Sequence, residues 1–232
     1  MISLCLTNYN RFEFLIESFA QVIDDNRISE IIISDDASND GSYEKLVEWF
    51  AGHGKVKLFQ NLSNKGMSLN KKIAVELATN NTCILFDSDN VISPDYINAL
   101  FHNGQLMTDK VINVPEWAQP DFKFSKYAGS FLRLKEAKES MIDPMFRCMM
   151  NCCNYVVNRQ MYIDVYEYDE TIKQADTIAF NYRWLQKGYC FYVVPGMRYF
   201  HRVHKQSGFL ENIDYNMKQA KEFENKILQL SE

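Results

Sequence analysis

The sequence predicts an α/β protein with a mostly parallel central sheet and helices on both of its faces. In the first hundred residues, short apolar runs alternate with amphipathic segments, and polar turn residues follow each run. The run at 82–86 is apolar enough to be a central strand buried on both sides. Alternating strands and helices are typical of parallel sheets, because parallel strands need a crossover connection. We expect one domain spanning residues 1–232.

The first hundred residues are expected to follow the order βαβαβαβ. Strands are predicted at 2–6, 31–34, 55–59 and 82–86, and helices at 12–22, 42–50 and 68–78. In the first helix, apolar residues recur at the spacing of one helix face: Phe12, Leu15, Ile16 and Phe19. Doubly wound sheets place ligands beyond the carboxyl ends of their strands. We therefore expect the polar clusters after these strands to share one rim: 7–10, 35–36 and 87–89.

The second half of the chain has a less regular pattern. Strands are predicted at 111–114, 154–157 and 189–194, and helices at 132–141, 176–187 and 214–230. The last helix has an apolar face that includes Phe223 and Ile227. Residues 115–131 combine aromatic and turn-forming residues without a clear period, so we expect an irregular segment there.

Composition excludes several classes of protein. The chain has 232 residues and a formal net charge of −5, and such an acidic balance argues against nucleic acid as a partner. No run approaches the length of a membrane span, and the N-terminus lacks the basic region of a signal peptide. The cysteines show no CxxC spacing, which favours reduced thiols. We expect a cytoplasmic protein without a transmembrane segment.

Asp87-Ser88-Asp89 follows the predicted central strand. Residues i and i+2 point the same way in an extended chain, so both carboxylates can converge on one cation or ligand. Mg²⁺ typically takes one or two carboxylates and completes its shell with phosphate oxygens and water. The motif therefore indicates chemistry linked to a nucleoside diphosphate, although an ordinary surface turn is the alternative interpretation.

Ordered motifs resemble those of family 2 glycosyltransferases: LTNYNR at 6–11, SDDASNDGS at 34–42, NKGMS at 64–68 and FDSDN at 86–90. The resemblance covers residues 1–100 and resumes at 150–204. It implies the GT-A fold, which is Rossmann-like, and an inverting reaction. It also implies that 1–100 bind the nucleotide-sugar, that 101–210 bind the acceptor and supply catalysis, and that 211–232 form a C-terminal helix.

The resemblance implies a nucleoside pocket lined by Thr7, Tyr9 and Arg11, with Asp36 accepting a hydrogen bond from the imide N–H of uracil or thymine. An ionised carboxylate only accepts hydrogen bonds, which suits that base edge. Two alternatives remain: the acidic turn at 35–42 caps the following helix through Asp40 or Ser42, and Arg11 is merely a solvated residue.

For the diphosphate and the metal, the resemblance implies that Asp89 binds the cation, with Asp87 and Ser88 beside the ribose and metal shell. Lys71 aligns with an arginine that contacts phosphate or nucleoside in the family. Lysine is a point charge and lacks the bidentate fork of arginine, and a solvated helix residue is the alternative. Asn90 stands where the family often has a third Asp.

The resemblance assigns the catalytic base to Asp176, which would take the proton of the acceptor hydroxyl. Ala175 replaces the Glu of the usual acidic pair, so one acid remains. A helix N-cap is the alternative role for Asp176, and Asp169 and Glu170 are backup candidates for the base.

His201 matches the histidine that completes the metal shell in many relatives, and His204 is its competitor. Imidazole suits Mn²⁺, which tolerates mixed nitrogen and oxygen ligands. Arg202 and Lys205 are candidates for holding the diphosphate, or are solvated charges.

We therefore expect an inverting glycosyltransferase of the hexosyltransferase type that depends on Mn²⁺ or Mg²⁺. It would move a sugar from a UDP donor to a hydroxyl of a sugar or lipid-linked sugar, in bacterial surface polysaccharide or glycoconjugate synthesis, with peripheral membrane contact for a lipid-linked acceptor. Acceptor contacts are expected at 117–131 and 145–153.

Two alternative functions remain. One is a binding module that has lost turnover, given Ala175 and Asn90. The other is a nucleotidyltransferase, although the glycine-rich phosphate loop of that class is missing after the first strand.

Overall fold

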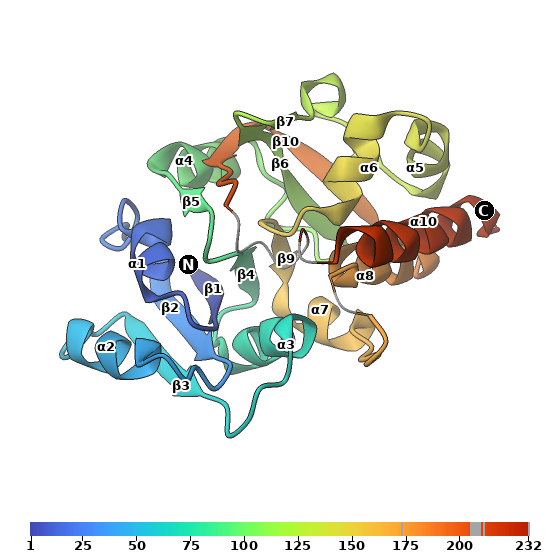
Figure 1. The fold of residues 1–232 in the computed structure, drawn as a ribbon. Helices are drawn as coiled ribbons and strands as arrows, with labels where there is room; N and C mark the ends of the chain where they lie inside the picture. The colour runs from blue at the N-terminus through green and yellow to red at the C-terminus, as the bar shows by residue number, and fades with distance from the viewer. Residues whose placement is uncertain (173, 205–209, 211, 232) are drawn as a thin grey trace.

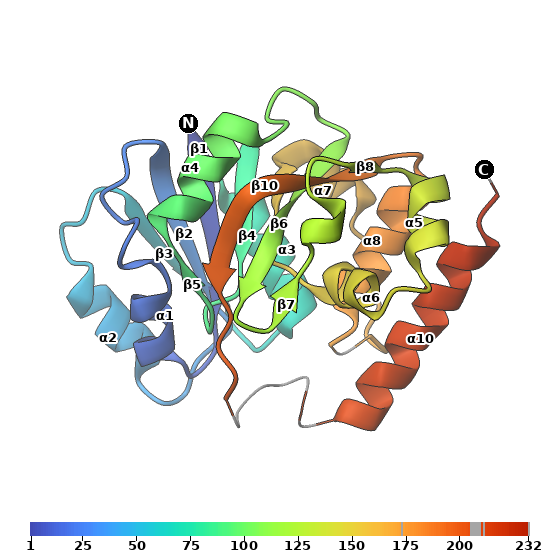
Figure 2. The same cartoon turned by 90° about the horizontal axis from the view of Figure 1, so that it is seen from above.

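The computed structural model describes residues 1–172, 174–204, 210 and 212–231. A single sheet runs through the centre of this structure, with helices packed on both of its faces (Figures 1 and 2). The main strands are, in spatial order, β3 (Val56–Gln60), β2 (Ile28–Asp35), β1 (Ile2–Asn8), β4 (Thr82–Phe86), β9 (Val156–Asn158), β6 (Val111–Gln119), β10 (Cys190–Phe200) and β5 (Val91–Ile92).

Most of the sheet is parallel, as predicted. β3, β2, β1 and β4 are parallel neighbours, and β6 and β10 form a second parallel pair. β9 lies between these two groups and is antiparallel to both β4 and β6. β5 pairs with the end of β10, and the short strands β7 (Phe122–Lys123) and β8 (Phe131–Leu132) are added to β6 and β10, all in antiparallel fashion.

The helices divide between the two faces of the sheet (Figure 2). One face is covered by α1 (Phe12–Phe19), α2 (Ser42–Trp49) and α4 (Pro94–Asn103). The other is covered by α3 (Met67–Leu77), α5 (Leu134–Ser140), α6 (Pro144–Asn151), α7 (Arg159–Val165), α8 (Asp176–Gln186) and α10 (Ile213–Gln229).

Alternation along the strands explains why both faces carry a core. In β1, Leu4 and Leu6 join the core under α1 and α4, whereas Cys5 between them joins the core under α3. In β4, Leu85 faces α3 and its neighbour Phe86 faces the opposite side. Because successive side chains point to opposite faces, a strand that is apolar throughout contributes to two cores at once.

The second half of the chain departs from several sequence-based expectations. The prediction that 115–131 are irregular is wrong: β6 continues to Gln119, and β7, a short 3₁₀ helix (Ser125–Tyr127) and the start of β8 follow. Pro115 hides this strand, because proline usually argues against a sheet interior. Likewise β10 extends six residues beyond Val194, through a break in register at Pro195 and Gly196.

Three helices were missed, namely α4, α6 and α7. Both α4 and α6 begin with a proline at their first position, where the missing N–H costs nothing. Asp143 caps α6 by accepting a hydrogen bond from the backbone of Met145 at 2.9 Å. These start signals were present in the sequence, and both helices bury an apolar face against the sheet.

Candidate active site

The carboxyl ends of β1 and β2 meet at one edge of the sheet, as predicted. Asn8 lies opposite Asp35 in the parallel register. The Asn8 amide donates to the Asp35 carboxylate at 2.8 Å, and the backbone N–H of Asp36 donates to the Asn8 carbonyl at 2.8 Å. This pairing fixes where the chain leaves both strands, and so fixes the position of the residues that follow.

Asp36 is buried and organises the loop that precedes α3. Its carboxylate accepts hydrogen bonds from the Asn61 amide at 2.9 Å and from the backbone N–H groups of Lys65 at 2.8 Å and Gly66 at 2.9 Å. Gly66 has a φ of +82°, a conformation that favours glycine. A carboxylate offers about four acceptor positions, so Asp36 retains capacity for a ligand.

The helix-capping alternative for the acidic turn is only partly right. Gly41 occupies the cap position of α2, and the Asp40 carboxylate accepts a hydrogen bond from the backbone of Ser42 at 2.9 Å. Asp40 therefore shapes this turn. Asp36 takes no part in it.

The expected nucleoside residues lie at the start of this edge. Thr7 is half-buried at the end of β1, and the Tyr9 side chain is 43% exposed. Arg11 immediately precedes α1 and forms an ion pair with Asp89 at 3.0 Å. The alternative that Arg11 is merely solvated is therefore wrong, because it connects the β1 end to the β4 end.

Asp89 also contacts a histidine, and that histidine is His204. The distance from His204 Nε2 to Asp89 Oδ2 is 3.0 Å, and the imidazole ring lies against Phe14 with ring centroids 4.9 Å apart. His201, the residue favoured from the sequence, contacts Asp121 at 2.7 Å instead. The structure thus brings the competitor His204 to Asp89 and leaves His201 with another partner.

The pair formed by Asp89 and His204 fits a divalent cation. One carboxylate and one imidazole suit Mn²⁺, and phosphate oxygens and water normally complete such a shell. Within the described ranges, no group of three or more His, Cys, Asp and Glu side chains is arranged to hold a metal by itself. A cation at this position would therefore depend on ligands from a bound diphosphate.

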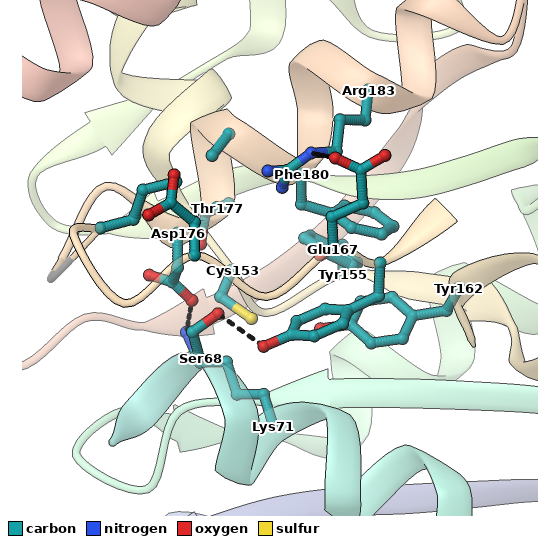
Figure 3. Close-up of a pocket in the computed structure, with 14 residues that line it drawn as sticks. Ser68, Lys71, Cys153, Tyr155, Tyr162, Glu167, Asp176, Thr177, Phe180 and Arg183 are labelled. Carbon is teal, nitrogen blue, oxygen red and sulfur yellow. Dashed lines mark hydrogen bonds and ion pairs between the residues drawn. The ribbon is translucent and has the colours of Figure 1, made fainter. Parts of the chain in front are cut away.

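Lys71 on α3 connects two carboxylates that come from different elements, Asp87 after β4 and Asp176 on α8. Figure 3 shows its contact with Asp176. Its Nζ lies 3.3 Å from Asp87 Oδ1 and 3.2 Å from Asp176 Oδ2, and the residue is only 6% exposed. The alternative of a solvated lysine is therefore wrong. Burial disfavours the ammonium form, but the two carboxylates outweigh this cost, and the pKa of Lys71 lies well above its ordinary value.

Asp87 is held from its backbone as well as from its side chain. Its N–H donates to the Asn154 side-chain oxygen at 2.7 Å. Burial, with the nearby carboxylates of Asp89 and Asp176, raises the pKa of Asp87 against the opposing charge of Lys71. Its neighbour Ser88, expected beside the ribose, is buried.

Asp176 is the first residue of α8 and is 9% exposed. The cap position belongs to Ala175, and the Asp176 carboxylate is directed at Lys71 (Figure 3). The helix-cap alternative for Asp176 is therefore wrong. The backup candidates Asp169 and Glu170 are both exposed, and Asp169 accepts hydrogen bonds from Thr171 within its own turn.

A polar pocket opens beside Asp176 (Figure 3). Ser68 and Tyr166 share a hydrogen bond of 3.1 Å across it, and Arg183 pairs with Glu167 at 2.9 Å on its far side. Aromatic side chains also line it, including Tyr155, Tyr162 and Phe180. Of the residues that line this pocket, sequence reasoning identified Lys71 and Asp176 and kept Asp169 as a backup candidate. It missed Tyr162 and Tyr166, which lie on and at the end of α7, a helix that it did not predict.

Asn154 is the other site residue whose role sequence reasoning missed. It has a φ of +60°, is buried, and accepts a hydrogen bond from Tyr96 Oη through its carbonyl at 2.8 Å. Asparagine is one of the few residues that adopts this left-handed conformation readily. That preference was the only signal, and a predicted strand at 154–157 concealed it.

The segment after β10 lies over α1 and over the turn at 87–90 that follows β4. The backbone N–H of Arg202 donates to Asn90 at 3.1 Å, and its guanidinium pairs with Glu17 at 2.8 Å and lies 4.6 Å from the ring centre of Phe14. Arg202 is therefore engaged with protein groups. Lys205, the other residue expected at the diphosphate, lies outside the described residues.

The family model of glycosyl transferase family 2 matches residues 3–145. This chain belongs to that family. Abequosyltransferase RfbV of Salmonella typhimurium is 32% identical over 104 residues, which are 43% of this chain and 31% of that protein. The aligned region thus spans less than a third of that relative.

Solved structures of low sequence identity share the fold. S. aureus TarS 1–349 in complex with UDP-GlcNAc has a TM-score of 0.71 at 14% identity. The match covers 98% of this chain and 70% of the TarS chain. The mannosyltransferase PcManGT from Pyrobaculum calidifontis, in complex with GDP-Man and Mn²⁺, has a TM-score of 0.71 at 14% identity. That match covers 100% of this chain and 65% of the PcManGT chain. The predicted GT-A fold is confirmed.

Of the helices in the described part of the chain, none is both long and apolar enough to cross a bilayer.

Proposed function

We propose that this chain transfers a sugar from a nucleoside diphosphate donor to a hydroxyl acceptor, with inversion at the anomeric carbon. The observation that carries the proposal is the gathering of Asp36, Asp87, Asp89 and Asp176 around one edge of the sheet, where Arg11 and Lys71 link three of them. Family membership and the fold support the same chemistry.

Asp36 supports a uridine donor. Its remaining acceptor capacity suits the imide N–H of uracil, and Thr7, Tyr9 and Arg11 lie on the same side of the sheet edge. Asp87 and Ser88 would stand beside the ribose. TarS and PcManGT were solved with UDP-GlcNAc and GDP-Man, so this fold accommodates donors of both bases.

Asp89 and His204 would hold Mn²⁺ or Mg²⁺. When bound, the cation supplies positive charge to the departing diphosphate. His201 is replaced in this proposal by His204, because the contact of His201 with Asp121 turns its imidazole elsewhere.

Asp176 is proposed as the general base. Its carboxylate takes the proton of the acceptor hydroxyl while that oxygen forms a bond to the anomeric carbon. The bond from that carbon to the diphosphate breaks on the opposite side, and the nucleoside diphosphate leaves with both bonding electrons.

The donor can be tested with purified protein and a panel of UDP-, dTDP-, CDP- and GDP-sugars. We expect slow release of nucleoside diphosphate from one UDP-sugar, with water as the acceptor, and loss of that release when EDTA removes the divalent metal. Release that persists at full rate in EDTA would contradict the metal assignment. Release from GDP-sugars alone would contradict the assignment of Asp36.

The base can be tested with Asp176→Asn and a matched control, Asp169→Asn. We expect Asp176→Asn to lower kcat by roughly 10²-fold to 10⁴-fold while donor affinity is retained. Asp169→Asn should stay close to the wild type. The reverse pattern would move the base to Asp169.

A binding module without turnover is the second candidate, because Ala175 and Asn90 stand where family members commonly have acids. It predicts that UDP binds with Mn²⁺ in calorimetry but that no donor in the panel is hydrolysed. For the active enzyme we propose a role in bacterial surface polysaccharide or glycoconjugate synthesis, in the cytoplasm, with a sugar or lipid-linked sugar as acceptor.

A further inference from the structure

Lys71 lies between the donor side and the acceptor side of the site. It is the charged group shared by Asp87 at the end of β4 and Asp176 at the start of α8. These two carboxylates lie 89 positions apart in sequence, yet a single ammonium contacts both of them. The contacts are made in an interior that contains Cys153, Tyr155 and Tyr162, where opposite charges interact more strongly than in water.

Lys71 is itself held in place by its neighbour. Asn70 is buried, and its side chain bonds to Ser34 on β2 in two ways: its oxygen accepts from the Ser34 hydroxyl at 2.6 Å, and its amide donates to the Ser34 carbonyl at 2.9 Å. The same Asn70 oxygen accepts from Asn61 at 2.9 Å, and Asn61 also bonds to Asp36. The hydrogen bonds of Asn70, the residue before Lys71, therefore anchor helix α3 to strand β2.

Among the described residues, the Asp176 carboxylate has a single hydrogen-bond partner, Lys71. Asp176 is the first residue of its helix, and the cap position before it belongs to Ala175, which gives no side-chain hydrogen bond. The hydrogen bond to Lys71 at 3.2 Å fixes the direction of its carboxylate. A fixed cation on α3 thus orients a carboxylate on α8, rather than the reverse.

We propose that Lys71 is a positioning residue that holds the base Asp176 in register with the donor-side carboxylate Asp87. The inference rests on the proposed function, since it concerns the transfer step. The resemblance implied instead that Lys71 contacts the donor phosphate or nucleoside. In this structure the ammonium of Lys71 is already paired with the carboxylates of Asp87 and Asp176. Lys71 acts through Asp176, so its loss should lower turnover more than donor binding.

The test compares Lys71→Gln, Lys71→Arg and Asp176→Asn with the double variant Lys71→Gln/Asp176→Asn. The readouts are UDP affinity with Mn²⁺ by calorimetry and the rate of UDP release from the UDP-sugar that the wild type hydrolyses fastest. We expect Lys71→Gln to lower kcat roughly 10²-fold, the scale of a misplaced catalytic group, with UDP affinity changed by less than about fivefold. The double variant should be no slower than Asp176→Asn, because residues that act as a unit are not additive.

Lys71→Arg preserves the charge and should keep at least about a tenth of the wild-type kcat, which is the rescue that an orienting cation predicts. Lys72→Gln is the matched control, because Lys72 is the next residue on α3 but pairs with Glu76 at the surface. It should behave as the wild type. If Lys71→Gln folds poorly, the double variant removes the isolated buried charge and provides the comparison with Asp176→Asn.

Two results would overturn the inference. A fall in UDP affinity that matches the fall in turnover would make Lys71 a donor contact. A double variant about 10²-fold slower than Asp176→Asn would show that Lys71 does not act through the base. Failure of the proposed function is a separate outcome, recognised by a wild type that releases no nucleoside diphosphate from any donor.

Discussion

Two groups of carboxylates meet at the sheet edge, and they are neutralised in different ways. Asp35 and Asp36, after β2, accept hydrogen bonds from amides, a hydroxyl and backbone N–H groups: Asn8, Ser38, Asn61, Lys65 and Gly66. Asp87, Asp89 and Asp176, after β4 and at α8, are paired with the cationic side chains of Lys71 and Arg11 and with His204.

This difference indicates that the two groups of carboxylates have different roles. Hydrogen bonds from neutral, rigid groups shape a loop and have no reason to change when a ligand arrives. Pairs with partly exposed side-chain cations, such as that of Arg11 with Asp89, can give way to a metal ion. The β2 carboxylates thus build the scaffold of the proposed nucleoside pocket, and the β4 and α8 carboxylates are available for metal binding and proton transfer.

The largest expected effect concerns Asp89. Asp89→Asn should lower metal-stimulated UDP release by roughly 10³-fold, because a bound metal contributes several kcal/mol to the transition state. Thermal unfolding should be nearly unchanged, since only partly exposed pairs are lost. Asp95→Asn, which breaks the exposed pair with Arg198, is the matched control. A large drop in Tm with normal turnover would place Asp89 among the scaffold carboxylates instead.

The two histidines provide the next test. His204→Ala should weaken the Mn²⁺ dependence of turnover by about 10-fold to 100-fold, because it removes the imidazole that lies on Asp89. His201→Ala should change it by less than threefold, since His201 contacts Asp121. Titration of activity with Mn²⁺ measures both. Equal effects of the two substitutions would contradict the arrangement of this segment.

Glu30 lies near the start of β2, at the end opposite Asp35, and has both a cationic partner, Lys57, and neutral partners, Ser3 and Thr79. It therefore tests the comparison in a single residue. Burial raises its pKa, but hydrogen bonds from Lys57, Ser3 and Thr79 outweigh this and lower the pKa of Glu30 to about 2. A lowered pKa in the folded state means that the stabilisation is fully present above the ordinary pKa near 4.5 and is lost as pH falls from there toward 2.

We therefore expect Glu30→Gln to reduce the free energy of unfolding at pH 7 by up to about 3 kcal/mol. The difference from the wild type should shrink between pH 4.5 and 2. Urea unfolding at several pH values measures this. Glu76→Gln, which removes an exposed carboxylate, is the control. A difference that stays constant across the acidic range would show that packing, rather than charge, accounts for the effect.

The smallest effect is expected at Ala37, inside the scaffold turn. Ala37 has a φ of +59°, a left-handed conformation that costs a residue with a Cβ about 1–2 kcal/mol. Ala37→Gly relieves this strain but adds flexibility to the unfolded chain, so a net gain of at most about 1 kcal/mol is expected. UDP affinity should not change. A clear loss of stability would indicate that the Ala37 methyl group makes contacts that outweigh the strain.

The first hundred residues were predictable to a large extent. Every strand and helix predicted between 2 and 86 is present, although α1 ends at Phe19 instead of Val22 and β2 begins earlier, at Ile28. Apolar runs of strand length and polar residues at strand ends are local properties of the chain. The rim formed by Asn8, Asp35 and Asp36 followed directly from them, because parallel strands end at the same edge.

The second half was less predictable for a physical reason. The helices α6 and α7, like α4 at the boundary between the two halves, are stabilised by packing on the sheet more than by their own sequence. The left-handed backbone conformation of Asn154, the extension of β6 beyond Pro115 and the position of residues 201–204 all depend on contacts between distant segments.

The amino-acid sequence by itself determined the order of strands and helices in the first half, the family and the acidic residues that line the edge of the sheet, because these depend on periodicity and on motifs of a few residues. Tertiary structure alone decided that His204 rather than His201 lies on Asp89, that Lys71 is buried between Asp87 and Asp176, and that Asp176 points into the site instead of capping its helix. Each of those pairings joins residues from different helices, strands or loops, and only the packing of separate elements on one sheet brings such side chains within hydrogen-bonding distance.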